Sequence, residues 1–386
     1  TAQISESSFV TDVAILNGKT IVCGGTLSAF CMQFDNPTGQ LSHTSTLPWD
    51  QINAIVTIDD ALVVVGQFNG GSEYVIARFN LNMRVLDWGF KTFSPQAKLQ
   101  SVTFHMNMQQ IITVGYNDNR QLIAAAVDKN SGALLWGNTY QISGLKAYIK
   151  GVESLPSDDG LCLAGYVINF AEGYKISIVL VNIDVFGTFT SMRTLKNSNG
   201  HVQANGLAIN PISGDAIIAG ISFTNANNIV NALIASLRSS DNSVVWAREF
   251  SSGAKDTFSD VHFIGNKLFS IGNSGGFDGS SKQDLIVMHL DAESGEVVKS
   301  MRISGPSSIT CSSLAEFEHG LRIACTVQEK ATLFFVDRNT LTTGDLPPGY
   351  TSHDDVEIVM SSVVSSELGL AANAHGGRFK LAQYNS

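Results

Sequence analysis

Val63-Val64-Val65-Gly66 is the plainest copy of a short pattern that decides the fold: three or four mostly apolar residues ending on a small one. The pattern recurs at intervals of roughly 40 to 55 residues along the chain. The copies end at Gly24, Gly66, Gly115, Gly165, Gly220, Gly272, Cys325 and Ala372. A unit that recurs at such a fixed interval is typical of a repeat architecture.

Each copy lies between further strand-like segments. An alternating stretch such as Asn53–Ile58 precedes it, and a second apolar stretch ending in Asp or Asn follows, as in Leu122–Asp128. A fourth stretch usually comes next, such as Ala133–Tyr140. Period-two alternation bounded by Gly, Asn and Asp turns indicates β-strands. Four strands per unit predict an all-β fold, a single eight-bladed β-propeller with four-stranded antiparallel blades.

The two ends of the chain predict how the ring closes. The last unit shows three strand candidates, Val356–Ser361, Glu367–Asn373 and Phe379–Tyr384, and then the chain ends. We expect the N-terminal segment Ala2–Ser7 to supply the missing outer strand, which makes residues 1–386 one propeller domain. The expected blade units are 9–51, 52–98, 99–146, 147–199, 200–254, 255–306, 307–350, and 351–386 together with 1–8.

The recurring glycines are interpreted as structural. We expect their strand to lie near the crowded centre, where a Cβ would push neighbouring blades apart. The positions concerned are Gly24, Gly66, Gly115, Gly165, Gly220 and Gly272.

Composition narrows the classes of function. Charged residues make up only 15% of the chain and the formal net charge is -10, so a nucleic-acid partner is disfavoured by repulsion from the phosphates. No apolar run is long enough to cross a bilayer as a helix. Residues Thr1–Ser8 carry no signal-peptide pattern. We expect an extracellular or periplasmic protein whose signal segment is already absent.

Five cysteines form two local pairs and one single residue. Cys23 and Cys31 are one pair, Cys311 and Cys325 the other, and Cys162 stands apart. Two short-range disulfides with a buried free thiol fit an exported protein. The alternative is five buried thiols that act as small apolar side chains.

One unit resembles the tryptophan-docking motif of the PQQ-type propeller repeats. It reads Ala126-Val127-Asp128-Lys129-Asn130-Ser131-Gly132-Ala133-Leu134-Leu135-Trp136, in which Asp128, Gly132 and Trp136 are the motif residues. Another, from Gly275-Gly276-Phe277-Asp278 to Gly295, is similar to bacterial SBBP-type repeats. The resemblance implies a propeller. Because the chain lacks the adjacent cysteine pair of the quinone enzymes, it implies the non-catalytic members and no cofactor. The three motif residues are interpreted as scaffold.

Two polar segments are weak candidates for a cation site. Asp278 and Asp284 delimit a Ser/Gly/Asp stretch, and His353-Asp354-Asp355 is the densest polar cluster. The first lacks the ligand spacing of a known calcium loop. The second, together with His375, could hold a cation or serve acid–base chemistry. A solvated loop or turn is the alternative in both cases.

The sequence therefore favours a non-enzymatic, exported propeller that binds proteins or copies of itself. In the self-assembling version, Ala2–Ser7 enters the last blade of a neighbouring copy. The alternative is a carbohydrate-binding, carbohydrate-active or quinoprotein-like protein with its site at the channel mouth.

Overall fold

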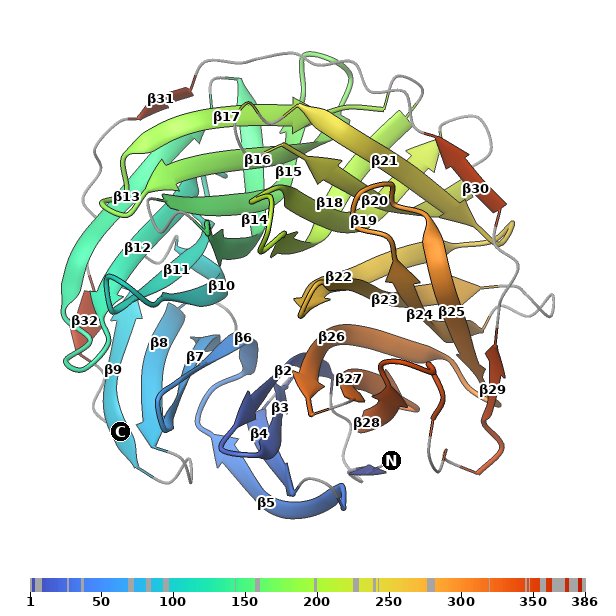
Figure 1. Ribbon diagram of the computed structural model, residues 1–386. Coiled ribbons are helices and arrows are strands. Elements are labelled where there is room, and N and C mark those ends of the chain that lie inside the picture. The colour runs from blue at the N-terminus through green and yellow to red at the C-terminus, as the bar shows by residue number, and fades with distance from the viewer. Residues whose placement is uncertain are drawn as a thin grey trace.

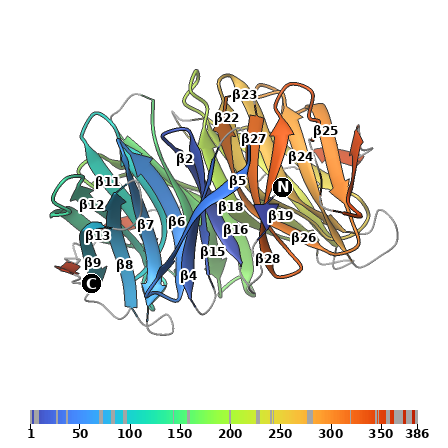
Figure 2. The ribbon, with the colours of Figure 1, turned by 90° about the horizontal axis from the view of Figure 1, so that it is seen from below.

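The computed structural model is a ring of seven antiparallel β-sheets, the blades, around a central channel (Figure 1). It describes residues 2–3, 9–25, 28–35, 38–68, 73–80, 85–92, 97–142, 144–156, 160–197, 200–224, 229–238, 241, 243–275, 282–318, 320–343, 346, 348–354, 359–362, 372–374 and 381–383. Seen from the side, the strands run between the two faces of the ring (Figure 2).

Within each blade, consecutive strands pair with one another, and the first strand lies innermost. Blade 1 contains β2 (Val10–Leu16), β3 (Lys19–Gly24), β4 (Ala29–Asp35) and β5 (Gln40–Leu47). Blade 2 contains β6 (Gln51–Ile58), β7 (Ala61–Phe68), β8 (Glu73–Asn80) and β9 (Leu86–Thr92). Blade 3 contains β10 (Lys98–His105), β11 (Gln110–Tyr116), β12 (Leu122–Asp128) and β13 (Leu134–Ile142). Blade 4 contains β14 (Leu145–Ser154), β15 (Gly160–Asn169), β16 (Lys175–Asp184) and β17 (Phe189–Leu195).

The remaining three blades follow the same order. Blade 5 contains β18 (Gly200–Ile209), β19 (Ala216–Thr224), β20 (Ile229–Leu237) and β21 (Val244–Ser251). Blade 6 contains β22 (Asp256–Ile264), β23 (Lys267–Gly275), β24 (Gln283–Leu290) and β25 (Val297–Ser304). Blade 7 contains β26 (Ile309–Phe317), β27 (Gly320–Val327), β28 (Lys330–Asp337) and, from the N-terminus, β1 (Ala2–Gln3).

The prediction of eight blades is wrong, because the C-terminal segment does not form a blade. Its strands instead add to the outer edges of blades formed earlier in the chain. These are β29 (Thr351–Asp354) on β25, β30 (Val359–Ser362) on β21, β31 (Ala372–Ala374) on β13 and β32 (Leu381–Gln383) on β9. We call these four strands the C-terminal belt.

Ring closure falls on the seventh blade instead of an eighth. β1 pairs antiparallel with β28, with Ala2 opposite Leu333 and Gln3 opposite Thr332. Within the described residues, the chain after β28 contributes no fourth strand to blade 7, only an isolated bridge between Thr343 and Val336. The N-terminal segment therefore completes the last blade, as expected, but residues 4–8 lie outside the described part of the chain.

Burial explains why the strands have different compositions. The second and third strands of a blade are covered by blades on both sides, so β7 and β12 are buried along nearly their whole length. The outer strand β5 faces solvent and is polar. Apolar side chains between blades form the core, for example Val114, Ile149 and Val179 between blades 3 and 4.

Every inner strand has a β-bulge at the equivalent position of its blade. This bulge explains why glycine recurs on the second strand. In blade 4 the register shifts between Ile149 and Gly151, and Gly165 lies opposite Ile149. A Cβ on Gly165 would overlap the carbonyl oxygen of Tyr148 on that inner strand. The same holds for Gly24, Gly66, Gly115, Gly220 and Gly272. The crowding thus comes from the bulged strand of the same blade, and not from the neighbouring blade that we expected.

Two disulfides lie in the blades on either side of the ring closure. Cys23 is joined to Cys31 in blade 1, and Cys311 to Cys325 in blade 7. Cys162 is a free, buried thiol.

Candidate functional site

The central channel is the largest cavity described, with a volume of about 560 Å³, and the seven inner strands form its wall. Each bulge turns one polar side chain toward it. These side chains are Thr11, Asn53, Gln100, Lys150, Asn205, Ser259 and Ser312.

Several members of this polar ring bond to the neighbouring blade. The Thr11 hydroxyl donates to the carbonyl of Ile52 at 2.7 Å, and the Asn53 amide donates to the carbonyl of Leu99 at 2.7 Å. Ser312 donates to the carbonyl of Val10 at 2.9 Å across the ring closure. Each blade is a separate sheet, so backbone pairing does not join the inner strands of neighbouring blades. Much of the polar lining supplies hydrogen bonds between them instead.

Two aspartates one position beyond the bulges make the same kind of connection. Asp12 Oδ2 accepts from the backbone N–H of Ile55 in blade 2 at 2.8 Å, and its Oδ1 accepts from the hydroxyl of Ser313 in blade 7 at 2.7 Å. Asp260 Oδ2 accepts from the backbone N–H of Leu314 at 3.0 Å. Asp12 thus links blades 7, 1 and 2, and Asp260 links blades 6 and 7.

Glu153 and His262 both lie three positions beyond a bulge, on blades 4 and 6, and both line the channel. His262 Nε2 lies 3.4 Å from Asp260 Oδ2. The channel therefore holds a mixed cluster of charged groups, which we call the channel cluster: Asp12, Glu153, Asp260 and His262.

Burial and mutual charge shift the pKa values of this cluster. Burial raises the pKa of Asp12 to about 6, although hydrogen bonds from Ile55 and Ser313 oppose the rise. Burial also raises the pKa of Glu153 to about 7. For His262, burial opposes protonation, but the carboxylates of Asp260, Glu153 and Asp12 raise the pKa to about 9. The cluster therefore favours the protonated forms of His262 and Glu153 more strongly than water does.

A second concentration of functional groups lies on one face of the ring. The turn between the second and third strands of every blade opens on this face, and so does the start of every inner strand. The Tyr148 and Tyr166 rings stack with centroids 4.8 Å apart, and the Tyr116 ring lies 5.0 Å from Tyr148. The Arg120 guanidinium carbon lies 5.0 Å from the Tyr116 ring and 4.8 Å from the Tyr148 ring.

The same surface continues along the turn between β15 and β16. Lys146 Nζ lies 4.6 Å from the centre of the Phe170 ring, which meets Tyr174 edge to face at 4.8 Å. Phe170 is 39% exposed and Tyr174 is 66% exposed. We call this surface the aromatic–cation cluster; it consists of Tyr116, Arg120, Lys146, Tyr148, Tyr166, Phe170 and Tyr174.

The candidate cation ligands of the sequence are not brought together. Asp284 lies on β24, where its carboxylate is 3.4 Å from Arg302 Nε. His353 and Asp354 lie on β29 at the rim of blade 6, and His353 Nε2 is 3.1 Å from the hydroxyls of Ser304 and Thr351. Asp278, Asp355 and His375 lie outside the described residues. Within the described part of the chain, no three His, Cys, Asp or Glu side chains are grouped so that they could hold a metal ion.

The motif residues Asp128, Gly132 and Trp136 lie at contacts between blades. The Asp128 carboxylate accepts from the backbone N–H of Ser131 at 2.8 Å, and Gly132 has a φ of +67°. Gly132 is packed against Trp88 of blade 2, whereas Trp136 Nε1 donates to the carbonyl of Val185 in blade 4 at 2.8 Å. The tryptophan of one blade therefore docks on the turn of the next.

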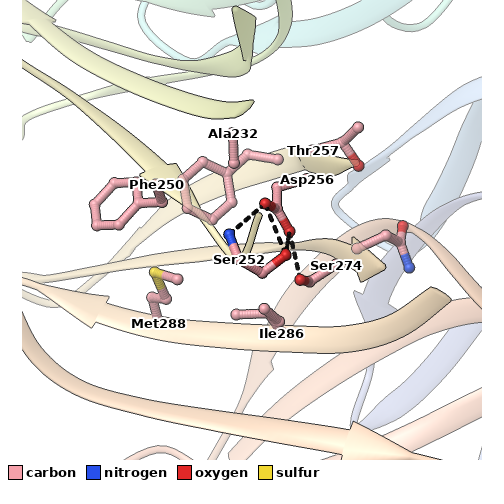
Figure 3. Close-up of a pocket in the computed structure, with 10 residues that line it drawn as sticks. Ala232, Phe250, Ser252, Asp256, Thr257, Ser274, Ile286 and Met288 are labelled. Atoms are coloured by element: carbon pink, nitrogen blue, oxygen red, sulfur yellow. Dashed lines mark hydrogen bonds between the residues drawn. The ribbon is translucent and has the colours of Figure 1, made fainter. Parts of the chain in front are cut away.

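The segment Gly272–Gly276 matches the G-x-S-x-G pattern of a nucleophile elbow, which requires a strand-to-helix turn. Ser274 instead lies inside β23 and is fully buried. Its hydroxyl donates to Asp256, which also accepts from the backbone N–H and hydroxyl of Ser252 (Figure 3). The small pocket beside these groups has a volume of about 10 Å³, too little for a substrate.

Comparison with known proteins supports the fold. No family model and no curated protein matches the chain. Among solved structures it is similar to the β-propeller domain of Cps50 (Swd1) from Myceliophteria thermophila, with a TM-score of 0.56 and 10% sequence identity. The match covers 86% of this chain and 98% of the other. The chain thus has a β-propeller fold, and membership of the PQQ-type or SBBP-type repeats stays a resemblance.

The sequence reasoning missed both the channel cluster and the aromatic–cation cluster. Glu153 and His262 are 109 positions apart, and their strands contain no motif that would draw attention to them. They are related only because each lies three residues after the bulge of its inner strand. Tyr148 takes the place of Lys98 in the preceding unit and of Gln203 in the following one, which was a visible signal, whereas Tyr166 corresponds to another tyrosine, Tyr116. No helix within the described residues is long and apolar enough to cross a membrane.

Proposed function

We propose that this chain is a non-enzymatic scaffold that binds other proteins through the face of the ring that carries the aromatic–cation cluster. The propeller fold fits a protein-interaction role, because its turns project from a rigid ring. The observation that carries the proposal is the exposed pair Phe170 and Tyr174, with the Lys146 ammonium over the Phe170 ring. Tyrosine, other aromatic residues and arginine are enriched in protein interfaces, where they contribute most of the binding energy.

The experiment compares two surface variants in a quantitative capture from the source material. One variant combines Phe170→Ser with Tyr174→Ser. The control combines Phe186→Ser with Ile212→Ser, which are 66% and 76% exposed in turns on the opposite face. We expect proteins retained by the wild type and the control to be lost from the first variant. Retention of every captured protein by the first variant would show that this face is not the binding surface.

Export is also part of the proposal. Two disulfides form and persist in an oxidising compartment, whereas the cytoplasm keeps thiols reduced. Native protein denatured without reductant should therefore accept one alkyl group, on Cys162, and five after reduction. Five alkyl groups without reduction would contradict both the disulfides and the exported location.

A self-assembling form of the scaffold remains part of the proposal. β1 contributes only two residues to blade 7 and pairs at its outer edge. The same pairing is available to β1 of a second copy, since strand addition uses only backbone bonds.

A second candidate is a carbohydrate-binding or carbohydrate-active site in the channel. The observation in its favour is Glu153, because a carboxyl group with a pKa of about 7 suits a general acid. The test measures turnover of a panel of aryl glycosides by wild type and by Glu153→Gln. Turnover lost only in the variant would support this candidate, and equal rates in both proteins would remove it.

A further inference from the structure

The two cations of the aromatic–cation cluster differ from three other basic residues on the same face, each of which is paired with a carboxylate. Lys91 is paired with Glu73 at 3.0 Å, Lys98 with Asp118 at 3.9 Å and Lys196 with Glu172 at 3.3 Å. Arg120 and Lys146 have no carboxylate partner among the described residues. Their positive charge is therefore available to a ligand.

Both cations are held in place before any ligand arrives. The backbone of Arg120 has a φ of +59°, and its carbonyl accepts from the N–H of Ala147 in blade 4 at 2.8 Å. Its guanidinium is placed over two tyrosine rings, and Lys146 over Phe170. Side chains that are already ordered lose less conformational entropy when a ligand binds.

The exposed rings are held by an ordered turn. The Asn169 side chain accepts from the backbone N–H groups of Ala171 and Glu172 at 3.0 and 3.3 Å. Gly173 and Tyr174 both have positive φ values, +74° and +65°, and Tyr174 points its ring to solvent. An apolar surface of this kind next to two free cations matches a ligand that combines carboxylates with an apolar side chain.

We infer that the aromatic–cation cluster binds an extended, acidic segment of a partner protein, with carboxylates on Arg120 and Lys146 and an apolar side chain against Phe170 and Tyr174. This inference rests on the proposed function and identifies the chemistry of the partner. The chain carries a net charge of -10, so an acidic segment is disfavoured by the molecule as a whole and is attracted locally by these two cations. Charge therefore selects the position of binding as well as the partner.

The test uses fluorescein-labelled peptides of equal length in three sets: Glu-rich with one Phe or Tyr, the same peptides with Gln for Glu, and the same with Lys for Glu. Binding is followed by fluorescence anisotropy at low and high salt. We expect the Glu-rich set to bind, the other two sets to bind at least about tenfold more weakly, and the affinity to fall as salt rises.

Matched variants assign the binding to the cluster. Arg120→Gln and Lys146→Gln should each weaken the Glu-rich peptides about fivefold or more, and Tyr174→Ser should weaken them at unchanged salt dependence. Lys330→Gln is the control, because it removes the same charge from a turn on the same face at blade 7. Equal binding of Glu-rich and Lys-rich peptides, or equal losses in the control, would overturn the inference.

The outcomes separate this inference from the proposed function. If the Phe170→Ser and Tyr174→Ser variant loses cellular proteins but acidic peptides show no preference, the face binds proteins of another chemistry. If glycans on an array bind and are lost with Arg120→Gln while the peptides do not bind, the surface recognises sugars and the inference is wrong.

Discussion

The glycine opposite the bulge in blades 1 to 6 is the residue on which the shape of those blades most directly depends; blade 7 has Cys325 there. In blade 6, a Cβ on Gly272 would overlap the carbonyl of Thr257, whereas a Cβ on Gly275 of the same strand would make ordinary contacts at 3.5 Å or more. We expect Gly272→Ala to lower the free energy of unfolding by about 1–3 kcal/mol, and Gly275→Ala to change it by less than about 0.5 kcal/mol. Urea unfolding of the two variants measures the difference. Equal effects would show that the bulge does not require glycine.

The channel cluster predicts how stability depends on pH. The pKa values of Asp12, Glu153 and His262 are raised in the folded protein, to about 6, 7 and 9 from 3.8, 4.5 and 6.5. Each group binds its proton more tightly when folded, so its stabilising effect is complete below the lower value and is lost as pH rises to the upper one. We therefore expect the melting temperature to fall between about pH 4 and about pH 9.

Glu153→Gln separates the contributions to this decline. The variant should lose the part of the decline between pH 4.5 and about 7 that belongs to Glu153, and keep most of the part between 6.5 and about 9 that belongs to His262. Melting curves measured across the range provide the test. A variant with the wild-type profile would mean that Glu153 does not titrate in this window.

The C-terminal belt is the element that sequence periodicity misassigned. Its strands have the alternation and spacing of a blade, and the sequence placed strands at 356–361, 367–373 and 379–384, close to β30, β31 and β32. Alternation shows that a segment is extended but not which strand it pairs with. The seven earlier units, in contrast, contain apolar strands buried on both sides, and these were recognised from the recurring apolar run that ends on a small residue.

Removal of residues 355–386 tests the role of the belt. Among the residues whose burial is described, the hydrophobic clusters lie between Val10 and Tyr350, and β30, β31 and β32 pair with the outer strands of blades. We therefore expect the seven blades to remain folded with a loss of about 1–3 kcal/mol. The outer strands β9, β13 and β21 would lose their partners, and exposed strand edges promote association. Calorimetry and light scattering measure both effects. Loss of cooperative unfolding would instead make the belt part of the core.

At the scale of the whole molecule, the ring depends on the contact between its first and last blades. Backbone pairing there is limited to β1, and side chains supply further bonds: Ser313 to Asp12, and the N–H of Val10 to the hydroxyl of Thr326 at 3.1 Å. The two disulfides lie in the same two blades. Blades 1 to 7 are joined in order by the chain itself. The ring is closed where blade 7 meets blade 1, through β1 and these side-chain hydrogen bonds.

This arrangement makes the N-terminal strand the natural place for exchange between copies. Because β1 is short and lies at the outer edge of blade 7, the side-chain hydrogen bonds between blades 7 and 1 can keep a ring closed without it. If copies assemble by placing β1 on β28 of a neighbour, deletion of residues 1–8 should abolish polymers and leave soluble, folded rings. Light scattering and electron microscopy of native and truncated protein distinguish the possibilities. Polymers that survive the deletion would reject strand exchange, and a monomeric native protein would reject self-assembly and leave the aromatic–cation cluster as the surface that binds partners.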